Sequence, residues 1–458
     1  MSGTIAWPQA LAGAHRLVAE PAAAAAAVGA ALAGAPCFQN RDFPLSPMPV
    51  LVRGAAAAQL RQPLAGYVEL LGDVVRHFRD NEEVRHWYGL PPAAERLIAA
   101  DRGPSDAPWV CRLDGYLELG TERLVVLENN ADAPAGTLFT ARINEVVGRI
   151  SAALGDAGSA GPGPLTYHGA DRFLNALRAG ARATAARVPG KAAEPAGLAV
   201  LQPAGAANRE SVETVAEFRA AGVDAFLADP RELRVVNGQA RFGSRTAELC
   251  WNKVNTVGWN TMAADPEFVA VWERALLDTP LVHLNPFGAR YVAENKLSLA
   301  FVQEPQFAHL FSDEQRELVT SLLPWTRRVT PDARSASGSQ LLTDELMEHQ
   351  GGYVLKEAYD IRGDGVTIGH DVPRGAWRAA VGRALAHGHI AQRAVKPLPY
   401  PVVTVGDERI AVMAISLDTY LLGGQVAGFG SKASHNAKIN IFQGGQKLAV
   451  HVLPEEHR

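Results

Sequence analysis

The stretch from Cys111-Arg112-Leu113-Asp114 to Leu127-Glu128-Asn129-Asn130-Ala131-Asp132-Ala133-Pro134 contains two short apolar runs that each lead to oxygen-bearing side chains. Gly120-Thr121 lies between them and is typical of a turn, so the sequence predicts a β-hairpin. Glu128 and Asn130 are two residues apart, which places both side chains on one face of an extended strand. With Asp114 on the neighbouring strand, these oxygens suit Mg²⁺. Acidic residues at strand ends are nevertheless often only solvated.

The overall composition indicates which classes of protein the chain can belong to. The chain has 458 residues, of which 47% are hydrophobic and 20% are charged, as in ordinary globular proteins. This length predicts two to four domain-sized units or one large enzyme with several lobes. The net charge of −4, without a dense Lys/Arg block, argues against a nucleic-acid partner. Outside one Ala-rich stretch, no apolar run reaches the roughly 20 residues of a membrane span, so no membrane partner is expected.

The cysteines and the Ala-rich stretch bear on the compartment. Cys37, Cys111 and Cys250 are far apart and form no CxxC motif, so we expect reduced thiols in a cytoplasmic protein, not disulfides or a zinc site. The stretch from Pro21 to Ala35 resembles the core of a signal peptide but lacks a basic lead-in. Because Ala favours helix strongly and is only weakly hydrophobic, a packed helix is the preferred interpretation.

The chain divides into four segments with different predicted secondary structure. Residues 1–104 are expected to be helical, and residues 105–164 to contain the hairpin, a helix and a Gly/Pro-rich linker. Residues 165–290 alternate strands and helices, which favours a parallel sheet with flanking helices. Within them Asn208 is expected to cap a helix, and Asn237-Gly238 to turn a hairpin. Residues 291–458 are expected to form helices, with Ser312 starting a capping box, and then a mixed α/β lobe.

A second group of residues suggests a nucleotide site. Lys356 ends an apolar strand, and the loop Asp360 to Gly369 supplies glycines whose backbone N–H groups can approach phosphates. Asn295-Lys296 begins a helix, and Gln392 ends a strand where its amide could bind an adenine edge. A surface hairpin is the commoner explanation of such glycines, and Lys356 could be an edge-strand lysine with only its stem buried.

In these motifs the chain resembles the ATP-grasp superfamily in its circularly permuted form, as in the synthetase domain of glutathionylspermidine synthase. In that family an Arg-x-Asp pair and a Glu-x-Asn-Ala-Asp-x-Pro segment precede the nucleotide lobes, and here they correspond to Arg112–Asp114 and Glu128–Pro134. The resemblance implies an α/β fold in which residues 105–164 carry the metal ligands. Residues 165–290 would form a pre-ATP-grasp-like domain and residues 291–458 the ATP-binding lobes. Residues 1–104 lie outside the resemblance.

The resemblance also implies roles for individual residues. It implies ATP and two Mg²⁺ ions as cofactors, with the ions held by Asp114, Glu128 and Asn130. It implies a nucleotide site formed by Lys296, Lys356, Arg362, Gly363, Gly365 and Gln392. Two positions depart from the family pattern. Arg393 follows the hinge Gln where an acidic residue is usual, and near Gly428–Ser431 the family arginine is replaced by Lys432 or His435.

The activity implied is that of an ATP-dependent carboxylate-amine ligase acting on a small carboxylate and an amine through an acyl phosphate. Arg112 and Lys432 would be the catalytic cations, although Arg112 could instead form a salt bridge with a neighbouring acid. Asp132 is expected to be a hydrogen-bond acceptor and not a metal ligand, and Lys253 and Asn255 are possible substrate contacts. A phosphotransferase, or a nucleotide-binding protein without turnover, would use the same nucleotide site.

Overall fold

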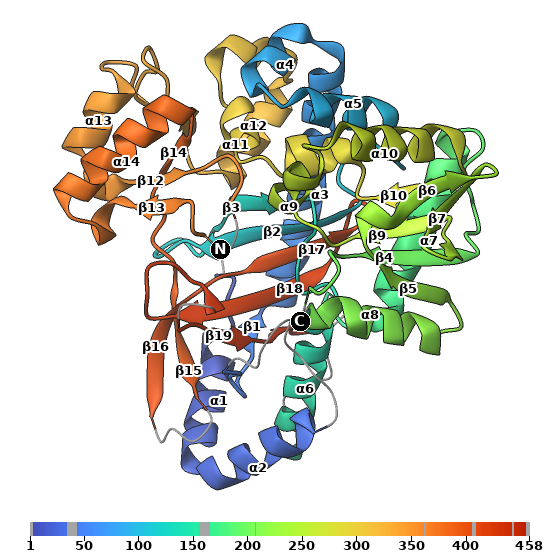
Figure 1. Cartoon of the computed structure of the whole chain (residues 1–458). Helices are drawn as coiled ribbons and strands as arrows, with labels where there is room; N and C mark the ends of the chain where they lie inside the picture. The colour runs from blue at the N-terminus through green and yellow to red at the C-terminus, as the bar shows by residue number, and fades with distance from the viewer. Residues whose placement is uncertain are drawn as a thin grey trace.

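The computed structural model describes residues 3–33, 44–154, 165–206, 208–360, 363–404, 409–441 and 444–454. Its centre is an antiparallel sheet in which an early hairpin joins strands from the C-terminal part of the chain (Figure 1). The hairpin consists of β2 (Val110–Leu117) and β3 (Leu124–Asn130), and β2 pairs antiparallel with β17 (Asp418–Leu422). The sheet continues through β18 (Gln425–Ser434), β16 (Ile410–Ile415) and β15 (Pro399–Val403), and β19 (Gln446–Leu448) pairs with β18. The predicted hairpin is therefore confirmed.

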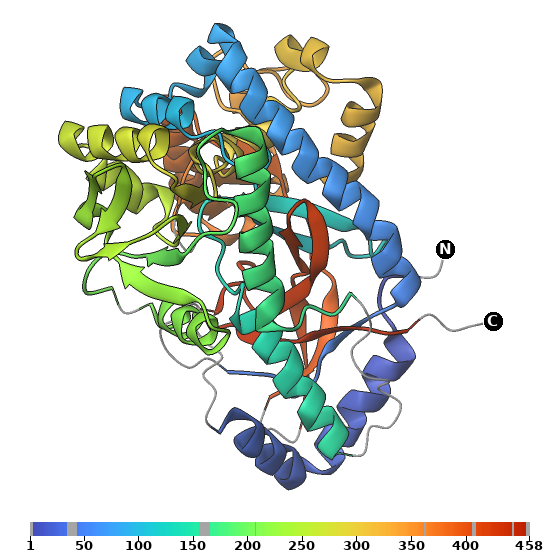
Figure 2. The same cartoon turned by 90° about the vertical axis from the view of Figure 1, so that its right-hand side faces the viewer.

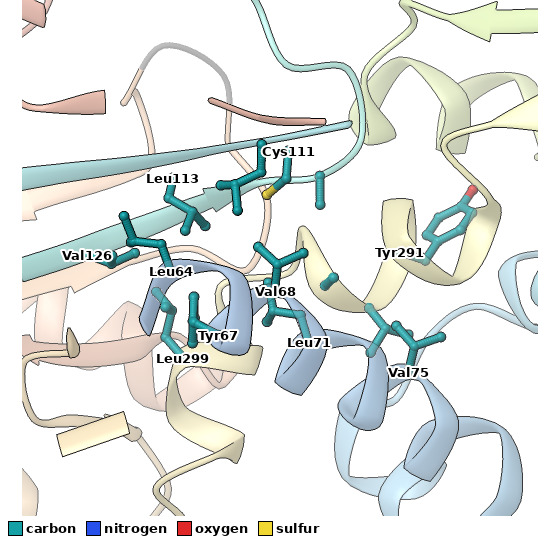
Figure 3. Packing of buried hydrophobic residues seen from close by; sticks show 14 of the residues in the cluster. Leu64, Tyr67, Val68, Leu71, Val75, Cys111, Leu113, Val126, Tyr291 and Leu299 are labelled. Atoms are coloured by element: carbon teal, nitrogen blue, oxygen red, sulfur yellow. The ribbon is translucent and has the colours of Figure 1, made fainter. Parts of the chain in front are cut away.

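The two faces of this sheet differ because side chains alternate along each strand. On one face, Cys111 and Leu113 of β2 and Val126 of β3 are buried against α3 (Gly54–Asp80), as Figure 3 shows. Figure 2 shows α3 as a long helix crossing the molecule. The amphipathic segment expected from Tyr67 to Phe78 lies in this helix. Arg112 and Asp114 consequently point to the opposite face.

Residues after the hairpin build an α/β unit around a parallel sheet, as predicted. Its strand order is β10-β9-β4-β5, with all neighbours parallel. Asn208 caps α8 through Ser211 N, and Asn237 and Gly238 both adopt positive φ at the turn of β6 and β7. The elements of this unit are α7 (Ala170–Arg187), β4 (Gly197–Leu201), α8 (Arg209–Ala220), β5 (Asp224–Ala228), β6 (Leu233–Val236), β7 (Gln239–Phe242), β8 (Arg245–Thr246), β9 (Leu249–Asn252), α9 (Thr256–Met262), α10 (Pro266–Asp278) and β10 (Val282–Leu284).

A separate antiparallel sheet forms the lobe that stands to one side of the central sheet (Figure 1, orange). Its strand order is β11-β14-β12-β13, so β12 lies inside the sheet. Tyr353 and Leu355 of β12 pack against Trp377 of α14, and the alternate residue Lys356 points to the other face. The lobe comprises β11 (Thr326–Arg328), α13 (Leu342–Glu348), β12 (Tyr353–Lys356), β13 (Val366–Ile368), α14 (Arg374–His387) and β14 (Ile390–Arg393). It follows α11 (Leu297–Phe301) and α12 (Asp313–Leu322), which begins at the predicted Ser312 capping box.

The N-terminal region is mainly helical, but it also contains β1 (Val50–Val52), which pairs parallel with β20 (Val450–Val452). The Ala-rich stretch forms α2 (Pro21–Leu32), which packs against α6 (Phe139–Ala153) and is the expected packed helix (Figure 2). The other helices are α1 (Trp7–Ala19), α4 (Glu82–Tyr88) and α5 (Pro92–Ala100). None of the helices in the described ranges is long and apolar enough to cross a membrane. The expected linker at 158–164 and Cys37 lie outside the described residues, while Cys111 and Cys250 are buried free thiols.

Asn285 connects the parallel α/β unit to the central sheet. Its side-chain Nδ2 donates to Val110 O at 2.6 Å and Ala131 O at 2.8 Å, and its Oδ1 accepts from Trp109 N at 3.1 Å and Val110 N at 2.8 Å. The side chain is fully buried. One amide therefore satisfies backbone groups on both sides of the hairpin that carries Arg112 and Asp114.

We expect Asn285→Ala to lower the free energy of unfolding by about 3 kcal/mol or more, because it leaves several buried backbone groups without partners at roughly 1–3 kcal/mol each. Chemical denaturation measures this change. Asn81→Ala, which removes only a helix cap at the start of α4, is the matched control and should cost about 1 kcal/mol. Equal losses in the two variants would show that Asn285 has no special role in joining the units.

Candidate functional site

A cavity of about 930 Å³ lies where the charged face of the central sheet meets the lobe of β12 to β14 and the α/β unit. Most of the predicted site residues line it, although they come from segments more than 300 positions apart: Arg112, Asp114, Glu128, Asn130, Lys356, Gly363, Gln392 and Lys432. Two other predicted site residues, Lys296 and Gly365, do not line the cavity. Lys296 is buried and contacts Glu128, which does line it. Arg362 lies outside the described residues.

The hairpin brings the three expected metal ligands and Arg112 together. Asp114 is the register partner of Glu128, and Arg112 that of Asn130, so all four side chains share one face. The Arg112 guanidinium donates to Asp114 Oδ1 at 2.5 Å, to Asp114 Oδ2 at 3.1 Å and to Asn130 Oδ1 at 3.1 Å. The structure thus contains the salt bridge that was considered as the alternative role of Arg112, with Asp114 as the partner. Burial alone would lower the pKa of Arg112, but Asp114, Tyr420 and Asp418 together outweigh it and raise that pKa.

A second acid, Asp418, completes this group and was not singled out from the sequence. Lys432 Nζ lies 3.0 Å from Asp114 Oδ2 and 2.9 Å from Asp418 Oδ2. Burial raises the pKa of Asp418, and the nearby Asp114 carboxylate raises it further. In the sequence, the only indication that Asp418 belongs to the site was its position at the start of an apolar strand. His435, the other residue considered at this turn, is exposed and does not line the cavity, whereas Lys432 does.

Lys296 is held by two carboxylates and is only 2% exposed. Its ammonium lies 2.9 Å from Glu128 Oε1 and donates to Asp360. Burial would lower the pKa of Lys296, but Glu128 and Asp360 reverse this effect and raise it. Lys296 therefore carries a permanent positive charge directly beside one of the expected metal ligands.

Lys356 is buried in an inner strand, so the alternative of a snorkelling edge-strand lysine is wrong. Its ammonium donates to the backbone carbonyl of Leu127 at 2.8 Å, next to Glu128. Burial lowers the pKa of Lys356 to about 8, and the Glu128 carboxylate opposes part of that shift. A lysine that is desolvated in this way is suited to binding an anion that supplies the missing negative charge.

Two further residues of the predicted nucleotide site, Gln392 and Gly363, lie at the lobe end of the cavity. Gln392 is buried, and its Nε2 donates to Thr326 Oγ1 at 3.2 Å. Gly363 adopts φ +76°, and its carbonyl accepts from Lys438 Nζ at 3.2 Å. Arg393, where the resembling family has an acid, is exposed and lies 3.4 Å from Glu345 Oε1. Arg393 therefore pairs with an acid that does not itself line the cavity.

The part of the cavity lined by the α/β unit is also lined by Asp132 and Glu294 from other segments, and it carries both signs of charge. Lys253 Nζ donates to Pro134 O at 2.8 Å and lies 3.5 Å from Glu210 Oε2, and burial lowers its pKa. Asp132 Oδ2 accepts from the backbone and hydroxyl of Thr256, which confirms it as a hydrogen-bond acceptor. Glu294 accepts from the N–H groups of Ala131 and Asp132, and burial raises its pKa well above the usual value.

Across the described ranges, no three His, Cys, Asp or Glu side chains converge closely enough to hold a metal ion on their own. Asp114 and Glu128 with the Asn130 amide nevertheless provide hard oxygen atoms on one face. Mg²⁺ commonly takes only one or two carboxylates from the protein and completes its shell with water and substrate phosphates. The donor set fits that mode of binding and does not fit a cage made by the protein alone.

We expect Lys356→Met to stabilise the protein at neutral pH, as measured by chemical denaturation. A lysine with a pKa of about 8 in the folded protein and about 10.4 when unfolded costs about 3 kcal/mol below pH 8, and this cost fades as the pH rises towards 10.4. The gain in unfolding free energy should therefore shrink across that range. Lys396→Met, at an exposed lysine of the same cavity, is the control and should show no such gain. A uniform loss of stability in Lys356→Met would contradict this interpretation.

The overall architecture is similar to that of solved synthetase-like structures. A glutathione synthetase-like effector from Globodera pallida, in its apo form, superposes with a TM-score of 0.59 at 13% identity, covering 94% of this chain and 97% of that one. A putative gamma-glutamylcysteine synthetase from Methylobacillus flagellatus KT covers 84% of this chain and 88% of its own, with a TM-score of 0.42 and 12% identity. No protein-family model matches this chain, and no curated protein matches it. The chain thus has a mixed α/β fold of the glutathione synthetase-like kind.

Proposed function

We propose that this protein is an ATP-dependent carboxylate-amine ligase that forms an amide bond through an acyl phosphate and releases ADP and phosphate. The observation that carries this proposal is the convergence in one cavity of the Asp114, Glu128 and Asn130 oxygens with the Lys356 ammonium. Oxygen ligands for a divalent cation and a buried cation for phosphates are the two requirements of nucleotide-dependent phosphoryl transfer. The glutathione synthetase-like fold supports the same class of reaction.

In this proposal the nucleotide lies at the lobe end of the cavity. Gln392 and the backbone of β14 would bind the base, while Lys356 and the loop at Gly363 would bind the phosphates. Asp114, Glu128 and Asn130 would hold the Mg²⁺ ions, which supply charge neutralisation for the β- and γ-phosphates. Lys296 would position Glu128 from behind, since its ammonium contacts that carboxylate at 2.9 Å.

The chemical step would take place between Arg112 and Lys432. A substrate carboxylate oxygen attacks the γ-phosphorus, the bond to the β-phosphate oxygen breaks, and the leaving group is ADP. The amine then attacks the acyl carbon, loses one proton, and phosphate leaves. Arg112 and Lys432 provide fixed positive charge for the carboxylate and the phosphoryl group. Two unit charges 4 Å apart interact by about 1 kcal/mol in water but by about 4 at an effective dielectric near 20, so burial strengthens both contacts.

The acceptor substrate would bind at the end formed by the α/β unit. Lys253 is a buried cation that a carboxylate can approach, and Glu294 is a buried acid that an ammonium or amine can approach. A substrate that carries both an acidic and an amino group would satisfy both ends. This charge pattern favours small charged molecules.

We expect Glu128→Gln to reduce ADP formation at least ~100-fold, because losing several kcal/mol of charge stabilisation at the phosphates corresponds to that factor. ADP release is measured against pooled carboxylates and amines, with mass spectrometry to identify any adduct. Glu118→Gln, on the same hairpin but outside the cavity, is the control and should keep full activity.

Three outcomes of this assay separate the candidate functions. ADP that forms only when carboxylate and amine are both present supports the ligase. ADP that forms equally well without any amine, together with a phosphorylated product, identifies a phosphotransferase on the same nucleotide site. ATP binding without ADP from any substrate pool contradicts the ligase and leaves a nucleotide-binding protein.

A further inference from the structure

The pair of acids around Lys432 contains a buried atom without a partner. Asp418 Oδ2 contacts the Lys432 ammonium at 2.9 Å, whereas Asp418 Oδ1 has no hydrogen-bond partner among the described residues. The side chain is 4% exposed, yet Asp418 lines the cavity. A buried carboxylate oxygen without a donor or a cation is costly in free energy, so such atoms in folded proteins generally have a partner, which can be a protein group, a water molecule or an ion.

Strand pairing places Asp418 beside the expected metal ligands. Asp418 begins β17, and the next residue, Thr419, is the register partner of Leu113, which precedes Asp114. The Lys432 ammonium lies between the two carboxylates, 3.0 Å from Asp114 Oδ2 and 2.9 Å from Asp418 Oδ2. Two carboxylates that share one monovalent cation on adjacent strands offer the same oxygens to a divalent cation.

We propose that Asp418 is a further divalent-cation ligand and that the Lys432 ammonium competes with the cation for the Asp114–Asp418 pair. The inference rests on the proposed function only in naming Mg²⁺ as the natural cation. Asp114 and Asp418 carry two negative charges, which Arg112 and Lys432 already balance. A divalent cation between them makes the ammonium of Lys432 redundant as a counter-ion.

Displacement of Lys432 has a functional consequence. Lysine has a flexible stem and three donors, so an ammonium released from the two carboxylates can reach an anionic oxygen elsewhere in the cavity. Binding of the cation would therefore make Lys432 available to the transferred phosphoryl group. The two events would be coupled, because the same carboxylates cannot hold the ammonium and the cation equally well.

Lys447 provides a matched control for the charge of Lys432. It is the register partner of Lys432 on β19, and it lines the same cavity. Within the part of the chain that the structure describes, Lys447 forms no ion pair with Asp114 or Asp418. Replacing either lysine with methionine removes the same charge from the same cavity, but only one replacement removes a competitor for the carboxylates.

The test measures binding of Mn²⁺ alone, without nucleotide, by the electron paramagnetic resonance signal of the free ion. We expect Lys432→Met to bind Mn²⁺ about tenfold more tightly than the unmodified protein, and Lys447→Met to differ by less than about threefold. Adding Asp418→Asn to Lys432→Met should abolish the gain. Equal affinities of Lys432→Met and Lys447→Met, or a gain that survives Asp418→Asn, would overturn the proposal.

Folding of each variant is checked by circular dichroism and thermal unfolding. If Lys432→Met does not fold, Lys432→Gln takes its place, and the single variant Asp418→Asn is measured as well; its affinity for Mn²⁺ should fall about tenfold. An unchanged affinity in Asp418→Asn would reject Asp418 as a ligand. Because no nucleotide and no turnover are involved, failure of this proposal is distinguishable from failure of the ligase assignment.

Discussion

The antiparallel pairing of β2 with β17 is the constraint on which the site depends. It adds a hairpin from the first third of the chain to one end of a sheet built from the last 60 or so residues. This pairing places Asp114 beside Asp418 and Lys432. The alternation of side chains then separates two functions within one strand. Cys111 and Leu113 join the core against α3, while Arg112 and Asp114 face the cavity.

Burial determines how strongly each charged group at the cavity depends on a partner of opposite charge. Lys296, Lys356 and Lys432 all sit in low-dielectric surroundings, but only the first and the last have carboxylates in direct contact, which raise their pKa values. Lys356 has a backbone carbonyl as its contact, and burial lowers its pKa to about 8. The three lysines therefore differ in how strongly they need an external anion, and Lys356 needs one most.

Local features of the fold were predictable because they depend on neighbours in the sequence. The β2–β3 hairpin, the shared face of Glu128 and Asn130, the capping by Asn208 and the Ser312 capping box all follow from short-range spacing. The interior position of Lys356 and the ion pairs of Lys296 and Lys432 were not predictable, because they depend on partners far along the chain.

The amino-acid sequence by itself determined which residue types could serve a cation and phosphates, and on which strands and loops they stand. Alternation and turn chemistry act over a few residues, so they can be inferred from the order of side chains alone. Only the tertiary structure decided that Asp418 stands next to Asp114, and that one ammonium lies between them. The contact of Asp114 with Lys432, 318 positions away, arises from strand pairing across the whole chain, which no local pattern specifies.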